Sequence, residues 1–412
     1  MINCGVDIIE ISRIREAVEK NSGFLKKVFS EKEIEYFESS GSRIETLAGF
    51  FAAKEAFVKY KKTGLRGLEL SEISVEHEKL GAPFVVFRGK KQALSLSIAH
   101  NKTQAVAVIC GENQKIDLTC HEQMKALIPK RSADAHKGDC GRVFIVAGSE
   151  GMTGAAVLSA RGALRCGAGL VTVGTAASER PIVASGVIEA MTVALDCENG
   201  KIIDSATEKI LEYAHKSDSV VFGPGLGQNR HIRRILRQLL AEYNGKFVID
   251  ADGLNALSEN CDILDKRRCE VVITPHPGEM SRLAKKEISE VQSNREQLAS
   301  EFAKRYGITV VLKGQNTVIA GCKTEDSDFR LHINTTGNCG MATGGTGDVL
   351  SGVVAGFIAQ GLSAYDAAVL GAYIHGKAGD IAANKYGIHG LIAGDVAEAV
   401  AFAIAHEIDI LD

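Results

Sequence analysis

The 412-residue sequence contains no tryptophan, and aromatic residues make up only 6% of it. It also lacks a long basic stripe. Proteins bind nucleic acid with cationic surfaces and stacking aromatic side chains, so this sequence offers no support for a nucleic-acid partner. No run of about 18 apolar residues is present to span a membrane. We therefore expect a protein that binds neither nucleic acid nor a membrane.

Ten cysteines are present, but they form no CxxC pair and show no metal-ligand spacing. A disulfide scaffold is uncommon in a chain of this size, so we expect reduced and mostly buried thiols. The first ten residues, MINCGVDIIE, carry acidic side chains where an export signal needs a basic region and a long apolar stretch. These absences favour a cytoplasmic protein.

The length suggests more than one hydrophobic core. The pattern over residues 1–112 is α+β, with an apolar strand at residues 2–9, a strong helix in LAGFFAAKEAFVKYKK and strand-like stretches up to Cys110. Residues 113–135 are polar, lack a strand, and are interpreted as a linker with the lead-in helix of a second domain, residues 136–412. The first 110 residues carry 17 basic and 14 acidic side chains, which suits an acidic or phosphate-rich partner or merely reflects solvated lysines.

Six near-continuous apolar runs mark the second domain, and helical segments lie between most of them: RVFIVAG, LVTVGT, SVVFGPG, KFVIDADG, EVVITPHPG and ITVVLKG. Such runs are typical of strands buried on both faces of a mostly parallel sheet flanked by helices. The predicted fold class is therefore α/β, with a small α+β domain in front. Ligands bind at the carboxyl ends of such strands, so the loops GPGLG, DADGLN, PHPGE and KGQNT should gather on one edge.

A glycine-rich run, NCGMATGGTGD, leads from Asn338 to Asp348 and straight into an apolar helix. Glycines before a helix N-terminus let several backbone N–H groups point at one anion, and the helix dipole adds to the attraction. An aspartate there would repel a phosphate unless it took a proton from the hydroxyl that attacks phosphorus. Asp348 is therefore our candidate catalytic base, and the alternative is that it only caps the helix.

A second pair of carboxylates lies in the first domain. Asp7 sits inside an apolar strand and Glu55 on a helix among Ala and Phe. Burying a lone carboxylate is costly, so Asp7 should have a partner or a metal, and two carboxylates on apolar elements suit Mg²⁺. The alternative is an ordinary helix ion pair between Glu55 and Lys59, which are four residues apart.

The GGTGD run before a helix resembles the anion hole and base of ribokinase-like enzymes. The other motifs narrow this resemblance to the ADP-dependent NAD(P)H-hydrate dehydratases. AHKGDCGRVFIVAGSEGMTGAAVLSARGALRCGAGLVTV is similar to that family's opening segment, and GPGLG, DADGLNAL, TPHPGEM and KGQNTVI follow in the family's order, over residues 120–405. The resemblance implies repair of NADH or NADPH that has added water (NADHX and NADPHX), with ADP or ATP phosphorylating the hydroxyl before it is eliminated.

The same resemblance implies which residues bind the two substrates. Those implied to cradle the nucleotide donor are Lys313, Gly314, Gln315, Asn316, Thr317, Gly345 and Gly347. Those implied to lie against the damaged dinucleotide are Ala155, Gly227, His276 and Asp348. From the residues alone, His276 between two prolines also suits a rigid turn, and Lys313 a solvated strand end. Asp250 and Asp252 suit strand-end caps or supporting residues and are left out of the catalytic set.

GVDIIEISRI, FAAKEAFVK, a short TGLRG turn, GAPFVVF and SIAH resemble holo-acyl-carrier-protein synthase over residues 1–110. This implies transfer of phosphopantetheine from coenzyme A to a serine of acyl carrier protein, with Asp7 and Glu55 as catalytic Mg²⁺ ligands. Lys59 and His100 would lie near the coenzyme A phosphates, and Arg13 on the face that meets the acidic carrier protein. The family often has Ser before this His, whereas the sequence has Ala99, and Ser97 is the nearest substitute.

Two alternatives to this pair of activities remain open. In the first alternative, the second domain is a small-molecule kinase, because Asp348 suits either reaction. In the second alternative, the first domain is a module kept only for oligomerisation, because active sites of the synthase family form between subunits. For the same reason we expect a homo-oligomer.

Overall fold

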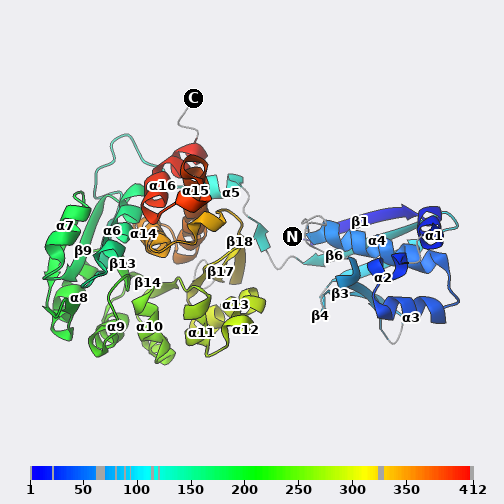
Figure 1. The fold of residues 1–412 in the computed structure, drawn as a ribbon, viewed down its shortest axis with the longest axis horizontal. Coiled ribbons are helices and arrows are strands. Elements are labelled where there is room, and N and C mark those ends of the chain that lie inside the picture. Colours follow the sequence, from blue (N-terminus) through cyan, green and yellow to red (C-terminus); the bar gives the residue numbers. More distant parts are fainter. Residues whose placement is uncertain are drawn as a thin grey trace. The chain divides into compact units, whose positions relative to one another are not determined.

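The computed structural model describes residues 2–20, 23–61, 70–78, 81–87, 90–92, 94–112, 116–118, 121–322 and 329–408. The chain divides into two compact units, Met1–Gln114 and Lys115–Asp412 (Figure 1). The TGLRG turn expected at residues 63–67 lies outside the described residues. Among the helices of the described ranges, none combines the length and the apolar character that a membrane span requires.

The N-terminal unit combines helices with two antiparallel sheets of three strands, ordered β1-β6-β5 and β2-β3-β4. The strand and the long helix expected around Asp7 and Glu55 are β1 and α4. The elements are β1 (Ile2–Glu10), α1 (Ile11–Lys20), α2 (Phe24–Val28), α3 (Glu31–Ser39), α4 (Ile44–Lys61), η1 (Leu70–Glu72), β2 (Ile73–His77), β3 (Pro83–Phe87), β4 (Lys90–Lys91), β5 (Ser95–His100) and β6 (Gln104–Glu112).

Helix α4 organises this unit because it packs directly on β1. A Cβ atom at Gly5 would lie 2.0 Å from the carbonyl oxygen of Ala56, so only glycine permits this approach. On its other side α4 buries Lys54, whose ammonium group lies 2.7 Å from the Glu33 carboxylate. The same ammonium donates hydrogen bonds to backbone carbonyls, including that of Val28 at 2.9 Å. The buried charge is therefore paired and hydrogen-bonded, as its burial requires.

The C-terminal unit is built on a ten-stranded sheet ordered β10-β9-β8-β13-β14-β15-β16-β17-β18-β7. The first seven strands in this order are parallel, and the six predicted runs are β8, β9, β13, β14, β15 and β16. The strands are β7 (Ile116–Leu118), β8 (Arg142–Val146), β9 (Leu170–Ala176), β10 (Met191–Leu195), β13 (Ser219–Phe222), β14 (Lys246–Ile249), β15 (Glu270–Ile273), β16 (Thr309–Leu312), β17 (Thr317–Cys322) and β18 (Phe329–Asn334), with a separate hairpin of β11 (Cys197–Glu198) and β12 (Lys201–Ile202).

Helices cover both faces of this sheet (Figure 1). Along β8, Val143 and Ile145 join one hydrophobic core, whereas Phe144 and Val146 join the other. The helices are α5 (His121–Leu127), α6 (Thr153–Arg165), α7 (Arg180–Gly186), η2 (Asp204–Ala206), α8 (Thr207–His215), α9 (Arg230–Glu242), α10 (Asp252–Ser258), η3 (Cys261–Lys266), α11 (Pro277–Ala284), α12 (Ile288–Ser293), α13 (Arg295–Tyr306), η4 (Cys339–Met341), α14 (Thr346–Ala359), α15 (Ala364–Gly390) and α16 (Ala393–Ile408). The sheet is thus buried on both faces, as the predicted α/β architecture requires.

The segment interpreted as a linker, residues 113–135, does contain a strand. β7 pairs in parallel with β18 at the end of the sheet, with Asp117 opposite His332. A three-residue edge strand is held by backbone hydrogen bonds to a single neighbour, so it leaves no periodic apolar pattern in the sequence. The expected lead-in helix is α5, which follows β7.

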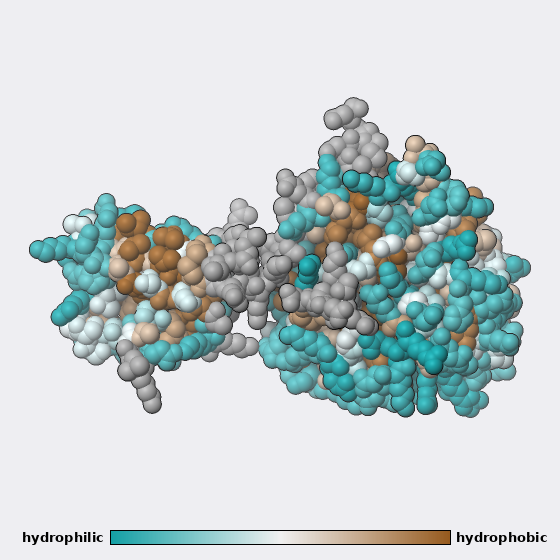
Figure 2. All heavy atoms as spheres, turned by 180° about the vertical axis from the view of Figure 1, so that it is seen from behind, coloured by the Kyte–Doolittle hydropathy of each residue, from teal (hydrophilic) through white to brown (hydrophobic). Residues whose placement is uncertain are grey.

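The expectation of mostly buried cysteines is also wrong. All nine cysteines in the described ranges are free, but only four are buried, and Cys4 and Cys339 are exposed. Cys4 lies opposite Cys110 on neighbouring strands, with 2.7 Å between their Sγ atoms. Cys4 belongs to the outer row of β1, together with the exposed Val6 and Ile8. This face of β1 lies open to solvent, so its apolar run is buried on one face only, and Figure 2 shows hydrophobic surface on one face of this unit.

Candidate functional site

Polar loops gather at one edge of the C-terminal sheet because they follow parallel strands. Gly223–Gly227 follows β13, Asp250 follows β14, Thr274–His276 follows β15 and Lys313 follows β16. The strands pair side by side in the order β13-β14-β15-β16, so their carboxyl ends meet. The predicted convergence of these four loops is therefore present in the fold.

At this edge Lys313 lies between two carboxylates. Its ammonium nitrogen is 2.7 Å from Asp250 Oδ1 and 3.8 Å from Glu279 Oε2. Burial alone would lower the pKa of Lys313, but Asp250 and Glu279 outweigh it and raise that pKa. Asp250 is only 1% exposed, and its Oδ2 is buried with no hydrogen-bond partner among the described residues. Lys313 is therefore held charged by acidic neighbours and is not a solvated strand end.

Asp348 faces the same cluster from the start of α14. The N-cap of this helix is Gly345, with φ of 95°, and Asp348 is its third residue, so the reading of Asp348 as the cap is wrong. Burial first, and then the charge of Asp250, raise the pKa of Asp348 to about 7. A carboxyl with this pKa is divided between its acid and base forms near neutrality, which suits proton transfer.

Gly347 keeps space open between this loop and Lys313. A Cβ atom at position 347 would lie 3.1 Å from Lys313 Nζ and 3.9 Å from Asp250 Oδ2. Gly344 has no neighbour within 4 Å of an added Cβ, whereas one at Gly345 would lie 2.5 Å from Leu158 of α6. The glycine run therefore combines an open approach at residues 344 and 347 with tight packing at 345.

His276 caps helix α11 and lies beside the charged cluster. Its Nδ1 accepts hydrogen bonds from the backbone N–H groups of Gly278 at 3.0 Å and Glu279 at 3.4 Å. Glu279 returns the interaction by accepting the N–H of His276 at 2.7 Å. Burial, followed by the charge of Lys313, lowers the pKa of His276. The ring is therefore neutral at physiological pH, with its proton on Nε2. The interpretation of His276 as a residue of a rigid turn describes part of its role, since it caps α11.

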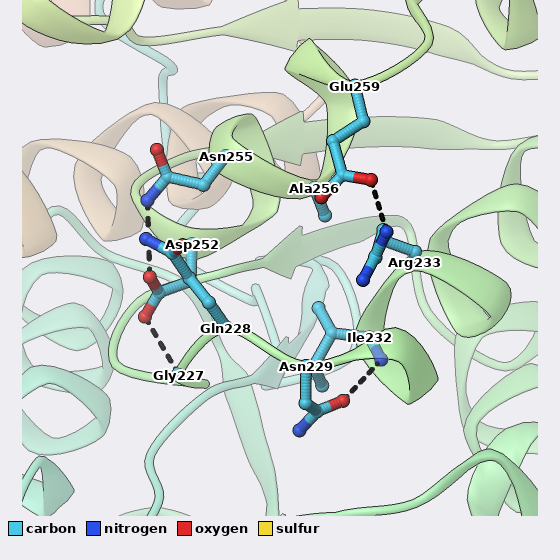
Figure 3. A pocket seen from close by; sticks show the side chains of 9 residues that line it. All are labelled: Gly227, Gln228, Asn229, Ile232, Arg233, Asp252, Asn255, Ala256 and Glu259. Atoms are coloured by element: carbon cyan, nitrogen blue, oxygen red, sulfur yellow. Dashed lines mark hydrogen bonds and ion pairs between the residues drawn. The ribbon is translucent and has the colours of Figure 1, made fainter.

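Ala155, in the first turn of α6, lies against the loop that contains Gly227. A Cβ atom at Gly225 would lie 2.9 Å from that of Ala155, and Met152 lies under both glycines of the Gly225–Gly227 segment. The backbone N–H of Gly227 donates to Asp252 Oδ2 at 2.8 Å, and Asn255 donates to the other Asp252 oxygen at 3.2 Å (Figure 3). Asp252 thus supports the Gly227 loop, beside a cavity of about 260 Å³.

The N-terminal unit brings Asp7 and Glu55 to the contact between β1 and α4. Lys59 pairs with Asp7, at 2.7 Å between Nζ and Oδ1, and the alternative pair with Glu55 does not form. Burial first, and then the Asp7 charge, raise the pKa of Glu55. Two carboxylates that raise each other's cost of ionisation in this way favour the approach of a cation. In the described ranges no group of three or more His, Cys, Asp and Glu side chains forms a larger metal site.

His100 shares a sheet face with Asp7. Asp7 lies opposite Ala107, which pairs with Ile98, and Ile9 lies opposite Ala105, which pairs with His100. Residues two apart on a strand point to the same face, so His100 and Ile98 face α4 with Asp7, whereas Ser97 points to the opposite face. Ala99 points to that same opposite face, so Ser97 lies in the same row of the strand as the position where the family often has serine. Arg13 is exposed on α1.

The structure places two further residues in the cluster: Asp250, which was left out of the catalytic set, and Glu279, which was not singled out from the sequence. Asp250 stands 63 residues from Lys313 in the chain, and a single carboxylate after a strand carries no signal of such a partner. Glu279 lies inside the TPHPGEM motif, which was the available signal for it.

The parallel sheet, its covering helices and the glycine run at the strand edge define a ribokinase-like enzyme fold. Residues 143–401 match the model of the NAD(P)H-hydrate dehydratase family, and the chain belongs to that family. Residues 3–110 match the model of the 4′-phosphopantetheinyl transferase superfamily.

Relatives and solved structures agree with this assignment for the C-terminal unit. A bifunctional NAD(P)H-hydrate repair enzyme of Moorella thermoacetica is 39% identical over 303 residues, 71% of this chain and 56% of that protein. The ADP-dependent (S)-NAD(P)H-hydrate dehydratase of Neisseria meningitidis is 35% identical over 71% of this chain and 94% of its own length. The ADP/ATP-dependent dehydratase of Bacillus subtilis, crystallised with ATP and Mg²⁺, is 27% identical with a TM-score of 0.60, over 72% of this chain and 100% of its own. The chain spans about half the length of the bifunctional relatives.

Proposed function

We propose that the C-terminal unit repairs hydrated NADH or NADPH by ADP-dependent phosphorylation and dehydration. The observation that carries this proposal is the Asp348 carboxyl, with a pKa of about 7, at the start of a glycine-led helix and beside Lys313. Asp348 takes the proton of the substrate hydroxyl, whose oxygen then attacks the terminal phosphorus of the donor. AMP leaves, and elimination of phosphate with a ring proton restores the double bond.

The surrounding residues position the two substrates. The backbone N–H groups of Gly345 and Gly347 at the helix N-terminus hold the transferring phosphate, and Lys313 supplies a positive charge beside them. The Lys313–Thr317 turn holds the donor. Ala155, Gly227 and His276 lie against the dinucleotide, with His276 offering its Nε2–H. The Neisseria relative is an ADP-dependent dehydratase and the Bacillus relative an ADP/ATP-dependent one, which supports ADP, or ADP and ATP, as donor.

The test is recovery of the reduced-nicotinamide absorbance when the full chain is incubated with hydrated NADH and ADP. We expect recovery with the wild type and a loss of about 10²-fold or more in the rate with Asp348→Asn, the usual scale for removing a general base. Asp395→Asn is the matched control, since Asp395 also lies in the first turn of a helix, α16. A stable phosphate ester without recovery of absorbance would identify a kinase and refute the proposal.

We infer that the N-terminal unit transfers 4′-phosphopantetheine from coenzyme A to a serine of acyl carrier protein. Asp7 and Glu55 would hold Mg²⁺, and the fit is supported by the raised pKa of Glu55 and by the Lys59 ammonium on Asp7. When bound, the metal neutralises the pyrophosphate as its bond breaks. Lys59 and His100 bind the coenzyme A phosphates, and the serine oxygen attacks so that 3′,5′-ADP leaves. Exposed Arg13 meets the acidic carrier protein.

The test is transfer of labelled phosphopantetheine to acyl carrier protein at several Mg²⁺ concentrations. Glu55→Gln removes one proposed ligand, so the Mg²⁺ concentration needed for half-maximal transfer should rise about tenfold or more. Glu35→Gln, at an exposed position on α3, serves as the control. Equal Mg²⁺ dependence in wild type and Glu55→Gln would remove Glu55 from the metal site, and no transfer by the wild type would favour an oligomerisation module.

We propose that the chain forms a homo-oligomer through the outer face of β1. Val6 is 49% exposed and Ile8 is 59% exposed, which is unfavourable in a monomer for adjacent apolar side chains of one row. Light scattering should give a mass above one chain for the wild type and a lower one for Ile8→Lys. An unchanged mass in Ile8→Lys would exclude this face.

A further inference from the structure

One arginine binds several backbone carbonyls at the turn between β16 and β17. Arg295 is the first residue of α13, and its Nη2 donates to the carbonyl of Leu312 at 2.9 Å and to that of Lys313 at 3.2 Å. Its Nη1 donates to the carbonyl of Gln315. The carbonyl of Gly314, between these residues, accepts a hydrogen bond from Thr317 Oγ1 at 2.9 Å. No carbonyl from Leu312 to Gln315 is left to repel an anion.

The backbone N–H groups of the same turn are in the opposite condition. Within the described part of the chain, those of Gly314, Gln315 and Asn316 have no hydrogen-bond acceptor. Gly314 has φ of 138° and Asn316 has φ of 56°, two left-handed backbone conformations that reverse the turn. A Cβ atom at Gly314 would lie 3.0 Å from Arg295 Nη2, so the arginine and the turn fit closely. Carbonyls that point to Arg295 leave the amides for an external anion.

Arg295 is kept in place at a cost in solvation. Burial lowers the pKa of its guanidinium group, and its Nε is buried without a hydrogen-bond partner among the described residues. The three carbonyls compensate for part of that loss because hydrogen bonds from a charged donor are strong. The guanidinium charge also adds to the positive field of the turn.

We propose that Arg295 is a positioning residue of the donor site, which holds the Lys313–Thr317 turn with its amides toward the phosphates of ADP or ATP. This inference rests on the proposed function of the C-terminal unit. Arg295 contacts the carbonyl side of the turn, so it acts through the backbone and does not touch the nucleotide. Its loss should weaken donor binding selectively and leave the proton transfer at Asp348 intact.

Arg267 provides a matched control. Its guanidinium group also donates to two backbone carbonyls, those of Leu264 at 2.9 Å and Gly307 at 2.6 Å. Its Nε, too, is buried without a partner in the described ranges. Arg267 precedes β15, however, so it lies at the sheet edge opposite the candidate site. Arg267→Ala should therefore cost stability in the same way while sparing donor binding.

The experiment measures ADP affinity by calorimetry, together with KM for ADP, KM for hydrated NADH and kcat. In Arg295→Ala we expect both the ADP dissociation constant and KM for ADP to rise about tenfold or more, equivalent to one lost charge-assisted hydrogen bond. KM for hydrated NADH and kcat should stay within about twofold, and Arg295→Lys should show an intermediate KM for ADP because an ammonium group cannot fork to three carbonyls.

Parallel changes in every constant, or an equal loss of ADP affinity in Arg267→Ala, would overturn the inference. If Arg295→Ala fails to fold, Arg295→Lys carries the comparison. The two proposals fail differently: a wild type that binds ADP but restores no absorbance refutes the dehydratase, while the calorimetric comparison still decides the role of Arg295.

Discussion

Replacing Asp348 with asparagine should remove activity and, above neutral pH, stabilise the C-terminal unit. The pKa of Asp348 is raised from 3.8 to about 7, by burial first and then by the charge of Asp250. The folded protein therefore holds this carboxyl in an unfavourable ionised state at alkaline pH, whereas the unfolded chain does not. Asparagine has nearly the same shape and no charge, so it removes this penalty.

The size and sign of the effect follow from the two pKa values. A rise from 3.8 to about 7 corresponds to about 4 kcal/mol at 1.36 kcal/mol per pKa unit. Between these two pH values the folded state binds more protons than the unfolded state, so stability falls as pH rises through this window and stays low above it. Asp348 is partly exposed, and solvent screening reduces the figure. We therefore expect Asp348→Asn to gain about 1–3 kcal/mol at about pH 8 and little at about pH 4.

The assay is urea unfolding of wild type and Asp348→Asn across this pH range, followed by a signal from the C-terminal unit. The difference between their free energies of unfolding should grow from about pH 4 to about pH 8 and then level. In the wild type, the rate of dehydration should fall as pH drops below about 7, because the base becomes protonated. A free-energy difference that does not change with pH would refute the raised pKa of Asp348.

Three further predictions concern buried charges and the glycine run. Lys313→Met should destabilise the C-terminal unit by about 3–5 kcal/mol in urea unfolding, because Asp250 loses its partner, and adding Asp250→Asn should restore most of the loss. Lys54→Met should lower the thermal midpoint of the N-terminal unit, because the buried Glu33 carboxylate loses its charged partner. The expected loss in the free energy of unfolding is about 3–5 kcal/mol. Gly347→Ala should raise KM for ADP by about tenfold with unfolding unchanged, because its methyl group would lie 3.1 Å from Lys313 Nζ.

The sequence predicted the central strands because burial on both faces leaves a strong pattern. β8 and β13 to β16 lie inside the sheet, so their residues are apolar without alternation. The edge strand β7 and the antiparallel strand β18 carry no such run, because an edge strand has one neighbour and β18 is less completely buried. The apolar run of β1 has a different basis, because one face of this strand packs on α4 and the other face is open to solvent.

The candidate site was predictable where a motif brings its residues together in the chain. The glycine run and Asp348 are such a case, and so is the capping pair of His276 and Glu279. The pairing of Lys59 with Asp7 was not predictable, since these residues stand 52 apart and a nearer partner, Glu55, was available. Only the packing of α4 on β1 at Gly5 decides between them.

The two units share an excess of negative charge at the sites proposed to receive phosphates. In the C-terminal unit, Asp250, Glu279 and Asp348 face the single ammonium group of Lys313, and in the N-terminal unit Asp7 and Glu55 face that of Lys59. An anionic substrate can enter such a site only if the excess is reduced. The N-terminal pair can achieve this with a divalent cation, for which two carboxylates are suited. In the C-terminal unit the N-terminus of α14 and the turn held by Arg295 supply the positive field that offsets the excess, which leaves Asp348 able to act as the base.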